Sequence, residues 1–352
     1  MLRKMTTLGA RVARSLEAGR GGFASALASR AWEATSRVSR RLTFESGSRV
    51  IAVGGSTLGG SGKTPLAMAC AKQLASDGDA VALVGHAYGA RPHHARIVAV
   101  DDEVVEVGDE ALAAARALAS SGVTVVVGPS RQAAIDHALR FARVVVLDGV
   151  GQTTPVRAHL ALLALDANEP WGANACPPRG DLRAAKAALL SACDRVVRVG
   201  AGGAGVVTTR PVDIVTLHSD GASLGTQPLP WSFLRERRIG LWTALARPGR
   251  LEAALAREGV NPVLLLRHGD HAVPSPRDIA EAIARARRAD VDLWVSTSKC
   301  VTHLPPHLGG IPVATLGYEL SLPTTLVNAL HHAVREAGSH APARLTAPRG
   351  GL

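Results

Sequence analysis

The glycine-rich segment 54–65, GGSTLGGSGKTP, constrains the fold of this chain more than any other feature. It follows a short apolar run and precedes an Ala-rich stretch, which is the strand–loop–helix context of a phosphate-binding loop. Its glycines leave backbone amides open to phosphate oxygens, Lys63 can pair with the β- and γ-phosphates, and the Thr64 hydroxyl can bind Mg²⁺. The residues predicted to bind the nucleotide are Thr57, Leu58, Gly59, Gly60, Ser61, Gly62, Lys63 and Thr64.

Short β-branched runs alternate with Ala-rich helical stretches from residue 49 to residue 199. The runs expected to form strands are 49–53, 80–84, 97–100, 123–127, 143–147, 159–165 and 194–199. Helices are expected from Lys63 and near 109–120, 130–141 and 182–192. Strands that alternate with helices indicate a mostly parallel sheet covered by helices on both faces. The predicted fold class is therefore α/β, of the P-loop NTPase type.

A second, smaller α/β portion is expected from about residue 238, with strands at 262–266, 292–296 and 311–316 and helices at 249–258, 275–289 and 324–337. The stretch 200–235 is richer in glycine and polar residues, so the boundary between the two portions is diffuse. The predicted division is a basic N-terminal segment 1–46, a P-loop core 47–205, a C-terminal α/β portion 206–338 that completes the site, and a flexible tail 339–352.

The N-terminal segment 1–46 contains nine basic residues and only three acidic ones, with apolar residues such as Phe23 and Trp32 between them at loosely helical spacing. One interpretation is a basic amphipathic helix that lies on an anionic membrane surface. The other is a solvated or partly disordered arm. No apolar run reaches the roughly 18 residues that a spanning helix needs.

The whole chain is basic, with 40 Lys and Arg residues against 29 Asp and Glu residues in 352. Such a balance is compatible with nucleic acid, an anionic membrane or a phosphorylated substrate. The chain contains no recognisable RNA- or DNA-binding module, and only 3% of its residues are aromatic. The sequence therefore predicts no nucleic-acid partner.

Thr57 occupies a position at which phosphate loops usually have glycine. With this threonine, the loop resembles the GNxTxGGTGKTP loop of the tetraacyldisaccharide 4′-kinase family, which phosphorylates a lipid A precursor. Further segments resemble this family's motifs in the same order: 84–90, 107–118, 125–135, 147–153, 171–185, 243–251, 269–279 and 295–300. The chain is thus identified by resemblance as a diverged member of this family.

The resemblance implies an enzyme that uses ATP and Mg²⁺ to phosphorylate the 4′-hydroxyl of an acylated glucosamine disaccharide 1-phosphate. Such a glycolipid lies in the cytoplasmic leaflet of the bacterial inner membrane. A peripheral protein on that face of the membrane is therefore expected, with segment 1–46 against the anionic surface.

By the resemblance, Asp109 matches the family's catalytic base. Such a base is needed because a sugar hydroxyl must lose its proton as the phosphoryl group arrives. From the residues alone, Gly-Asp-Glu before an Ala-rich helix also suits a helix N-cap. The resemblance further implies that Glu110 assists in binding the metal and that His271 pairs with the base, with Asp270 in a position to orient this histidine.

Asp148 ends an apolar run, where a parallel-sheet NTPase places an acid linked to Mg²⁺, and it is predicted to act in catalysis and metal binding. The family has two adjacent aspartates here. An ungapped alignment makes Asp148 the first and Gly149 the replacement of the second, whereas a shift of one residue makes Asp148 the second. In either alignment one carboxylate is missing.

The resemblance assigns substrate binding to Tyr88, Arg131 and Arg183. Three further family residues are replaced, an arginine by His86, a histidine by Thr153 and a glutamate by Ala184. These replacements leave open a second hypothesis, a catalytically impaired nucleotide-binding relative. A third is a P-loop ATPase of the partition or metallochaperone type, although the chain has neither the lysine that often begins the loop in that class nor a metal-binding Cys/His run.

Overall fold

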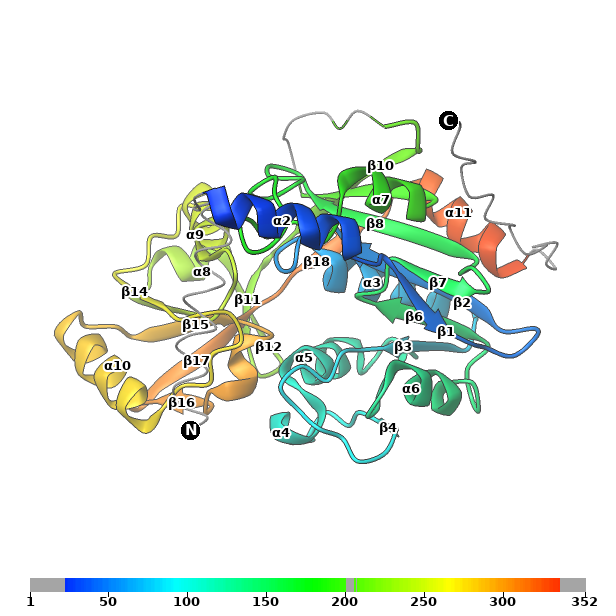
Figure 1. Ribbon diagram of the computed structural model, residues 1–352. Helices are drawn as coiled ribbons and strands as arrows, with labels where there is room; N and C mark the ends of the chain where they lie inside the picture. Colours follow the sequence, from blue (N-terminus) through cyan, green and yellow to red (C-terminus); the bar gives the residue numbers. More distant parts are fainter. Residues whose placement is uncertain (1–22, 201–205, 207, 336–352) are drawn as a thin grey trace.

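The apolar runs of the first part of the chain form the inner strands of a nine-stranded sheet in the computed structural model, which describes residues 23–200, 206 and 208–335. The strand order is β18-β10-β9-β8-β2-β6-β3-β5-β4 (Figure 1). Their bounds are β2 Arg49–Gly55, β3 Val81–Val84, β4 Arg96–Ile97, β5 Thr124–Val127, β6 Val144–Asp148, β8 Leu160–Asp166, β9 Arg195–Val199, β10 Val212–His218 and β18 Glu319–Ser321. Only the two edge strands, β4 and β18, pair antiparallel.

Helices cover both faces of this sheet, because buried parallel strands present apolar side chains on each side. One face packs against α3 (Lys63–Ser76), α5 (Asp109–Leu118) and α11 (Thr324–Arg335). The other packs against α6 (Arg131–Ala138) and α7 (Lys186–Ala192). Strand β2 is buried along its whole length and lies between β6 and β8. The predicted α/β fold with a mostly parallel sheet is confirmed, and we call this sheet with its helices the first lobe.

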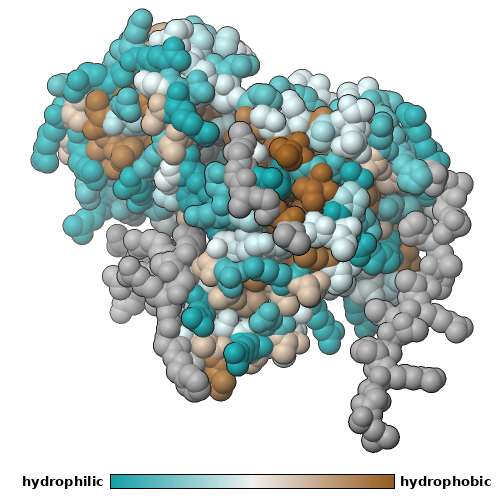
Figure 2. Space-filling view, turned by 90° about the horizontal axis from the view of Figure 1, so that it is seen from above, coloured by the Kyte–Doolittle hydropathy of each residue, from teal (hydrophilic) through white to brown (hydrophobic). Residues whose placement is uncertain are grey.

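A seven-stranded sheet forms the second lobe, with the order β12-β11-β17-β15-β13-β14 and β16 beside β17. The strands are β11 Gly221–Leu224, β12 Gln227–Pro230, β13 Ile239–Thr243, β14 Leu264–Arg267, β15 Leu293–Thr297, β16 His307–Leu308 and β17 Ile311–Leu316. Helices α8 (Trp231–Arg235) and α9 (Pro248–Arg257) cover one face, and α10 (Pro276–Arg288) covers the other. The two lobes are seen side by side in Figure 1, and from above in Figure 2.

The chain enters and leaves the second lobe through strands of the first. Strand β10 pairs with β9 in the first sheet before the chain continues into β11. After β17 the chain returns through β18, which pairs with β10, and ends in α11 on the first lobe. The predicted segment 206–338 thus contributes strands to both sheets, and the predicted tail 339–352 lies outside the described residues.

Part of the basic N-terminal segment is helical. Helix α2 (Phe23–Thr35) precedes β1 (Ser39–Leu42), which pairs in parallel with β7 (Gln152–Pro155). Two bonds tie α2 to the segment before α7: the Ser29 hydroxyl donates to the Cys176 carbonyl, and the Trp32 indole donates to the Arg183 carbonyl over 3.3 Å. Residues 1–22 of the predicted segment lie outside the described residues. No helix among those described is long and apolar enough to span a membrane.

Candidate active site

The phosphate loop joins the end of β2 to the start of α3, as its sequence predicts. Gly62 occupies the N-cap position of α3 with φ 81°, and Gly60 has φ 74°. Both values lie in the left-handed region, which favours glycine. Among the described residues, the backbone amides of Gly59, Gly60 and Ser61 donate to no backbone carbonyl, so they are available to a bound anion. The N-terminal end of α3 adds a favourable dipole at the same place.

The entrance of the loop is held by the segment that precedes α7. The Leu58 amide donates to the Asp181 carbonyl over 2.9 Å, and the Arg183 amide donates to the Ser56 carbonyl over 2.8 Å. Thr57 lies between these two bonds, opposite Leu182, and its hydroxyl donates to the Gly59 carbonyl over 2.6 Å. A threonine at this unusual position therefore stabilises the turn of the loop itself.

Asp148 lies beside the loop because β6 is the neighbour of β2 in the sheet. Its Oδ2 accepts a hydrogen bond from the Thr64 hydroxyl over 2.7 Å, and its buried Oδ1 has no hydrogen-bond partner among the described residues. A threonine hydroxyl and a free carboxylate oxygen are donors that suit Mg²⁺. Among the described residues no group of three His, Cys, Asp or Glu side chains could hold a metal alone, so a cation here would depend on phosphate oxygens and water as well.

A second cluster lies at the N-terminus of α5, where it meets two loops of the second lobe. Asp109 is the first residue of α5 and is 3% exposed. Its Oδ2 and Oδ1 lie 2.8 and 3.0 Å from Nδ1 of His271. Lys299 Nζ lies 3.0 Å from Nε2 of the same ring and 2.7 Å from Asp270 Oδ1. Since an ammonium group can only donate, Nε2 of His271 accepts, and Nδ1 carries the proton that is donated to Asp109.

The electrostatics of this cluster keep Asp109 ionised. Burial by itself raises the pKa of this carboxyl, but the hydrogen bonds from His271 and His303 and the charge of Lys299 outweigh it and hold the pKa well below its usual range. Burial works against the charge of Lys299 as well, yet Asp270, Glu110 and Asp109 raise its pKa above the ordinary value. The cluster therefore holds a carboxylate and an ammonium group at neutral pH.

The helix-cap interpretation of Asp109 accounts for only part of its contacts. Gly108 occupies the N-cap position of α5, and the Asp109 carboxylate accepts the Glu110 amide over 2.8 Å. The remaining contacts of this carboxylate are with histidines of the second lobe, His271 and His303, the latter at 3.7 Å. A side chain that only capped its helix would not need these partners.

Tyr88 and Glu110 border the His271 ring. The Tyr88 ring stacks on it with centroids 3.9 Å apart, and Tyr88 is 52% exposed. Glu110 Oε1 lies 3.7 Å from Nε2 of His271 and 3.9 Å from Lys299 Nζ. His271 itself has φ 56°, an uncommon conformation for a residue other than glycine that aims its ring at Asp109. The predicted residues Tyr88, Asp109, Glu110 and His271 are thus brought together.

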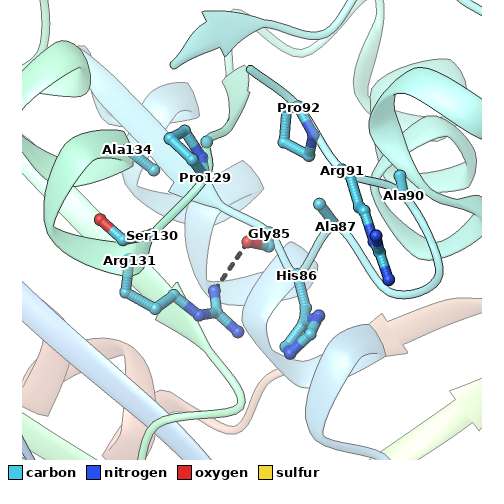
Figure 3. Close-up of a pocket in the computed structure, with 11 residues that line it drawn as sticks. Gly85, His86, Ala87, Ala90, Arg91, Pro92, Pro129, Ser130, Arg131 and Ala134 are labelled. Carbon is cyan, nitrogen blue, oxygen red and sulfur yellow. Dashed lines mark hydrogen bonds between the residues drawn. The ribbon is translucent and has the colours of Figure 1, made fainter. Parts of the chain in front are cut away.

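Arg131 and His86 line a cavity of about 350 Å³ beyond the ends of β3 and β5 (Figure 3). Arg131 donates through Nη1 to the carbonyls of Val84 and Gly85, at 2.9 and 2.7 Å. Partial desolvation, together with the charge of Arg131, lowers the pKa of His86 and leaves this imidazole neutral at pH 7. Arg131 also lies near the phosphate loop. A Cβ at Gly149, the residue after Asp148, would lie 3.4 Å from Arg131 Nη2 and 3.8 Å from Lys63 Cε.

The sequence interpretation did not place Lys299 and His303 in this cluster, whereas in the structure Lys299 contacts His271 and His303 lies beside Asp109. The signals for Lys299 in the sequence are its place in the segment 295–300, which resembles a family motif, and its position just after the predicted strand 292–296. The replaced positions Thr153 and Ala184 are both buried, and Thr153 bonds to the Val156 carbonyl over 2.8 Å within its own turn. Arg183 lies beside the loop entrance through its backbone, rather than in the histidine cluster.

Both halves of the site lie at the carboxyl ends of parallel strands. Strands β2 and β6 lead into the phosphate loop and Asp148, whereas β14 and β15 lead into His271 and Lys299. Ligand sites of open α/β sheets occur at this edge. The fold and the site define an α/β P-loop nucleotide-binding protein with a buried aspartate–histidine pair between its two lobes.

Comparison with known proteins identifies the family. The family model described as tetraacyldisaccharide-1-P 4′-kinase matches residues 21–335. A tetraacyldisaccharide 4′-kinase of Anaeromyxobacter sp. (strain Fw109-5) is 34% identical over 285 residues, which cover 73% of this chain and 74% of that one. Another, of Geobacter metallireducens, is 29% identical over 297 residues, 80% of this chain and 87% of that one. The chain belongs to the tetraacyldisaccharide-1-P 4′-kinase family, and the resemblance drawn from its motifs is confirmed.

A solved structure supports the fold. The structure of LpxK from Aquifex aeolicus, in complex with ATP, superposes with a TM-score of 0.62 at 19% identity. The match covers 84% of this chain and 91% of that one. At this identity the likeness concerns the arrangement of the two lobes and not individual side chains.

Proposed function

We propose that this chain transfers the γ-phosphate of ATP to the 4′-hydroxyl of a tetraacyldisaccharide 1-phosphate, a precursor of lipid A. Membership of the family supports the activity, and one observation carries it for this chain. We call Asp109, His271, Lys299 and Asp270 the base cluster. It borders the phosphate loop, since a Cβ at Gly59 would lie 3.5 Å from Asp270 Oδ2. His271, which follows Asp270 in the chain, contacts Asp109 and so ties this carboxylate to the border of the loop. Transfer to a hydroxyl needs a carboxylate near the γ-phosphate.

Asp109 is the proposed base. Its carboxylate, kept ionised by its neighbours, accepts the proton of the sugar hydroxyl as the oxygen attacks phosphorus. Nδ1–H of His271 orients this carboxylate and stabilises its charge before the transfer. Lys299 holds the histidine in the required tautomer through Nε2. The three side chains form a chain of positioned groups in which only Asp109 touches the reacting atoms.

The phosphate loop is the proposed site of ATP, with the amides of residues 59–61 and the Lys63 ammonium facing the phosphates. Thr64 and Asp148 would hold Mg²⁺, and the unpartnered Oδ1 of Asp148 is the observation that fits this ion. When bound, Mg²⁺ would neutralise charge on the β- and γ-phosphate oxygens. Glu110 lies near the proposed base, with its Oε1 3.7 Å from Nε2 of His271. It is proposed to assist in binding the metal ion.

The acceptor is proposed to enter over Tyr88, whose exposed ring covers His271. The cavity of Figure 3 is lined mostly by small residues, among which Arg91, Ser130 and Arg131 supply basic and polar groups. Such a lining suits the anionic, hydroxyl-rich headgroup of a glycolipid. Arg183 is proposed to act from the entrance of the loop, where its backbone is already fixed.

Helix α2 is proposed to face the cytoplasmic surface of the bacterial inner membrane. It exposes Leu27 (60% exposed) and Trp32 (44%), and Arg30 lies between them in sequence. The segment that follows adds Arg37, Arg40 and Arg41. Exposed apolar and basic side chains together favour an anionic lipid surface. We propose no nucleic-acid partner.

Incubation of the purified protein with Mg-ATP and tetraacyldisaccharide 1-phosphate tests the activity. The expected product carries a second phosphate, detected by mass spectrometry or by thin-layer chromatography with labelled ATP. The missing second carboxylate after β6 favours an alternative, a catalytically impaired relative. Protein that binds Mg-ATP but leaves the acceptor unchanged would support that alternative and refute the proposal.

A further inference from the structure

Two arginines of the second lobe reach across to the phosphate loop. Arg247 immediately precedes α9 and Arg250 lies in its first turn. Arg250 Nη1 donates to the Gly60 carbonyl over 2.9 Å. We call Arg247 and Arg250 the arginine clamp. Neither is explained by the base cluster or by the proposed metal group.

Three carboxylates of the first lobe hold the clamp in place: Asp166, at the end of β8, Glu169 and Asp181. Arg247 pairs with Glu169 and with Asp181, each at 2.7 Å. Arg250 pairs with Asp166 and with Glu169, the latter at 3.0 Å. The Arg247 side chain is only 11% exposed and that of Asp181 only 5%, so this pair is shielded from solvent screening. Each guanidinium group is thereby held by two carboxylates.

The bond from Arg250 sets the direction of a loop amide. The peptide between Gly60 and Ser61 is trans, so its C=O and N–H point to opposite sides. With the carbonyl turned to Arg250, the Ser61 N–H is directed to the side opposite Arg250. This amide donates to no backbone carbonyl among the described residues. The clamp thus presents a donor to a bound phosphate group.

The loop glycines also lie close to the segment that precedes α9. A Cβ at Gly60 would lie 3.3 Å from Arg247 Cδ, and one at Gly59 would lie 3.2 Å from the Cβ of Ala246. Arg247 also holds the loop entrance indirectly, because Asp181 receives Arg247 on its side chain and the Leu58 amide on its carbonyl. Two glycines and Asp181 therefore connect the clamp to residues 58–60 of the loop.

We infer that the arginine clamp positions the phosphate loop for the nucleotide, so that the second lobe contributes to ATP affinity without touching ATP. Arg250 is a positioning residue that acts through the Gly60–Ser61 peptide, and Arg247 supports it through Asp181. The inference rests on the proposed function only in taking ATP as the ligand of this loop. It predicts an effect on nucleotide binding that is larger than the effect on turnover at saturating ATP.

The test compares Arg250→Gln and Arg250→Lys with Arg257→Gln, a matched control at the exposed far end of the same helix. Mg-ATP affinity is measured by isothermal titration, and thermal unfolding is measured in parallel. Because a hydrogen bond to a charged donor is lost, we expect the Gln variant to bind Mg-ATP about tenfold more weakly. The Lys variant should lose less, since it retains one donor and the charge. The control should bind as the wild type does.

Equal affinity of a folded Arg250→Gln variant and the wild type would overturn the inference. If that variant unfolds, the double variant Asp166→Asn/Arg250→Gln decides, because it removes the less exposed opposing charge and leaves the Arg247–Glu169 pair in place. Mg-ATP affinity equal to that of the wild type would then overturn the inference. The two proposals fail separately. Wild-type protein that binds Mg-ATP but phosphorylates no acceptor refutes the kinase assignment, while the affinities still test the clamp.

Discussion

The phosphate loop and the base cluster are built by different means, although they border each other. The loop is one continuous segment, 54–65, and its donors are mostly backbone amides exposed by glycine. The base cluster joins side chains from Asp109, His271 and Lys299, which are 162 and 28 residues apart in sequence. The first depends mainly on local backbone geometry, which the arginine clamp supports from outside, whereas the second exists only where the two lobes meet. Substitutions should therefore separate nucleotide binding from proton transfer.

The largest separation is expected from Asp109→Asn. The amide keeps the size of the side chain but cannot take a proton from the sugar hydroxyl, so turnover should fall roughly 10³-fold. Affinity for Mg-ATP should change little, because the amides of the loop are untouched. Turnover is measured with saturating acceptor, and affinity by titration. Asp101→Asn, an exposed acid of the preceding loop, is the control. If Asp109→Asn retained its turnover, Asp109 would not be the catalytic base.

The same difference explains how much could be predicted from the sequence. The loop and its flanking strand and helix were predicted within two residues, because the motif is contiguous and each glycine acts locally. Asp109 and His271 were predicted only through family resemblance. Lys299 and His303 were missed as partners of the base, because their proximity arises from strand pairing in the second sheet.

The strands that were missed have a separate cause. Strand β12, QPLP, lies at an edge of the second sheet, where prolines are tolerated and little apolar pattern is required. Strands β1 and β7 are polar along most of their length, so neither gave an apolar run. The predicted strand at 97–100 shrinks to the two-residue edge strand β4. Apolar patterning detects buried strands, and these strands lie at edges or form a separate two-stranded pair.

A smaller effect, and a pH dependence, is expected from His271→Asn. Asparagine tolerates the left-handed backbone at φ 56°, so the substitution tests the imidazole. The imidazole is one of the groups that lower the pKa of Asp109, so its loss raises this pKa from its depressed value, although His303 and Lys299 remain. Turnover should fall about tenfold to hundredfold, as for a lost hydrogen bond to a charged group. The acid limb of the pH profile of kcat/KM should move to higher pH.

The sign of this shift follows from which form is active. The base must be ionised, so activity is lost as the pH falls through the pKa of Asp109, and a higher pKa brings that loss closer to neutrality. The Asp109–His271 pair likewise stabilises the fold above the ordinary carboxyl pKa, and this stability is lost as the pH falls through the folded value. An unchanged acid limb in a folded variant would mean that His271 does not control the ionisation of Asp109.

The smallest effect on turnover is expected from Gly149→Asp, beside the phosphate loop. This substitution tests most closely whether the loop and the base cluster act independently. Gly149 has φ 76°, so any side chain here costs roughly 1 kcal/mol of backbone strain. The added Cβ meets only ordinary contacts, 3.4 Å from Arg131 Nη2 and 3.8 Å from Lys63 Cε. A carboxylate at this point faces two cations and lies next to Asp148. We therefore expect the Mg²⁺ concentration for half-maximal turnover to fall a few-fold, with the acid limb set by Asp109 unchanged.

Gly149→Asn is the matched variant for this prediction, since it introduces the same strain and nearly the same volume without the charge. Both variants should lose similar stability in thermal unfolding, and only the aspartate should lower the Mg²⁺ requirement. If the two variants respond to Mg²⁺ alike, the second carboxylate contributes nothing at this position, and Asp148 with Thr64 is sufficient for the metal. If the acid limb moves in the aspartate variant, the two regions are coupled electrostatically, and the division between nucleotide binding and proton transfer does not hold.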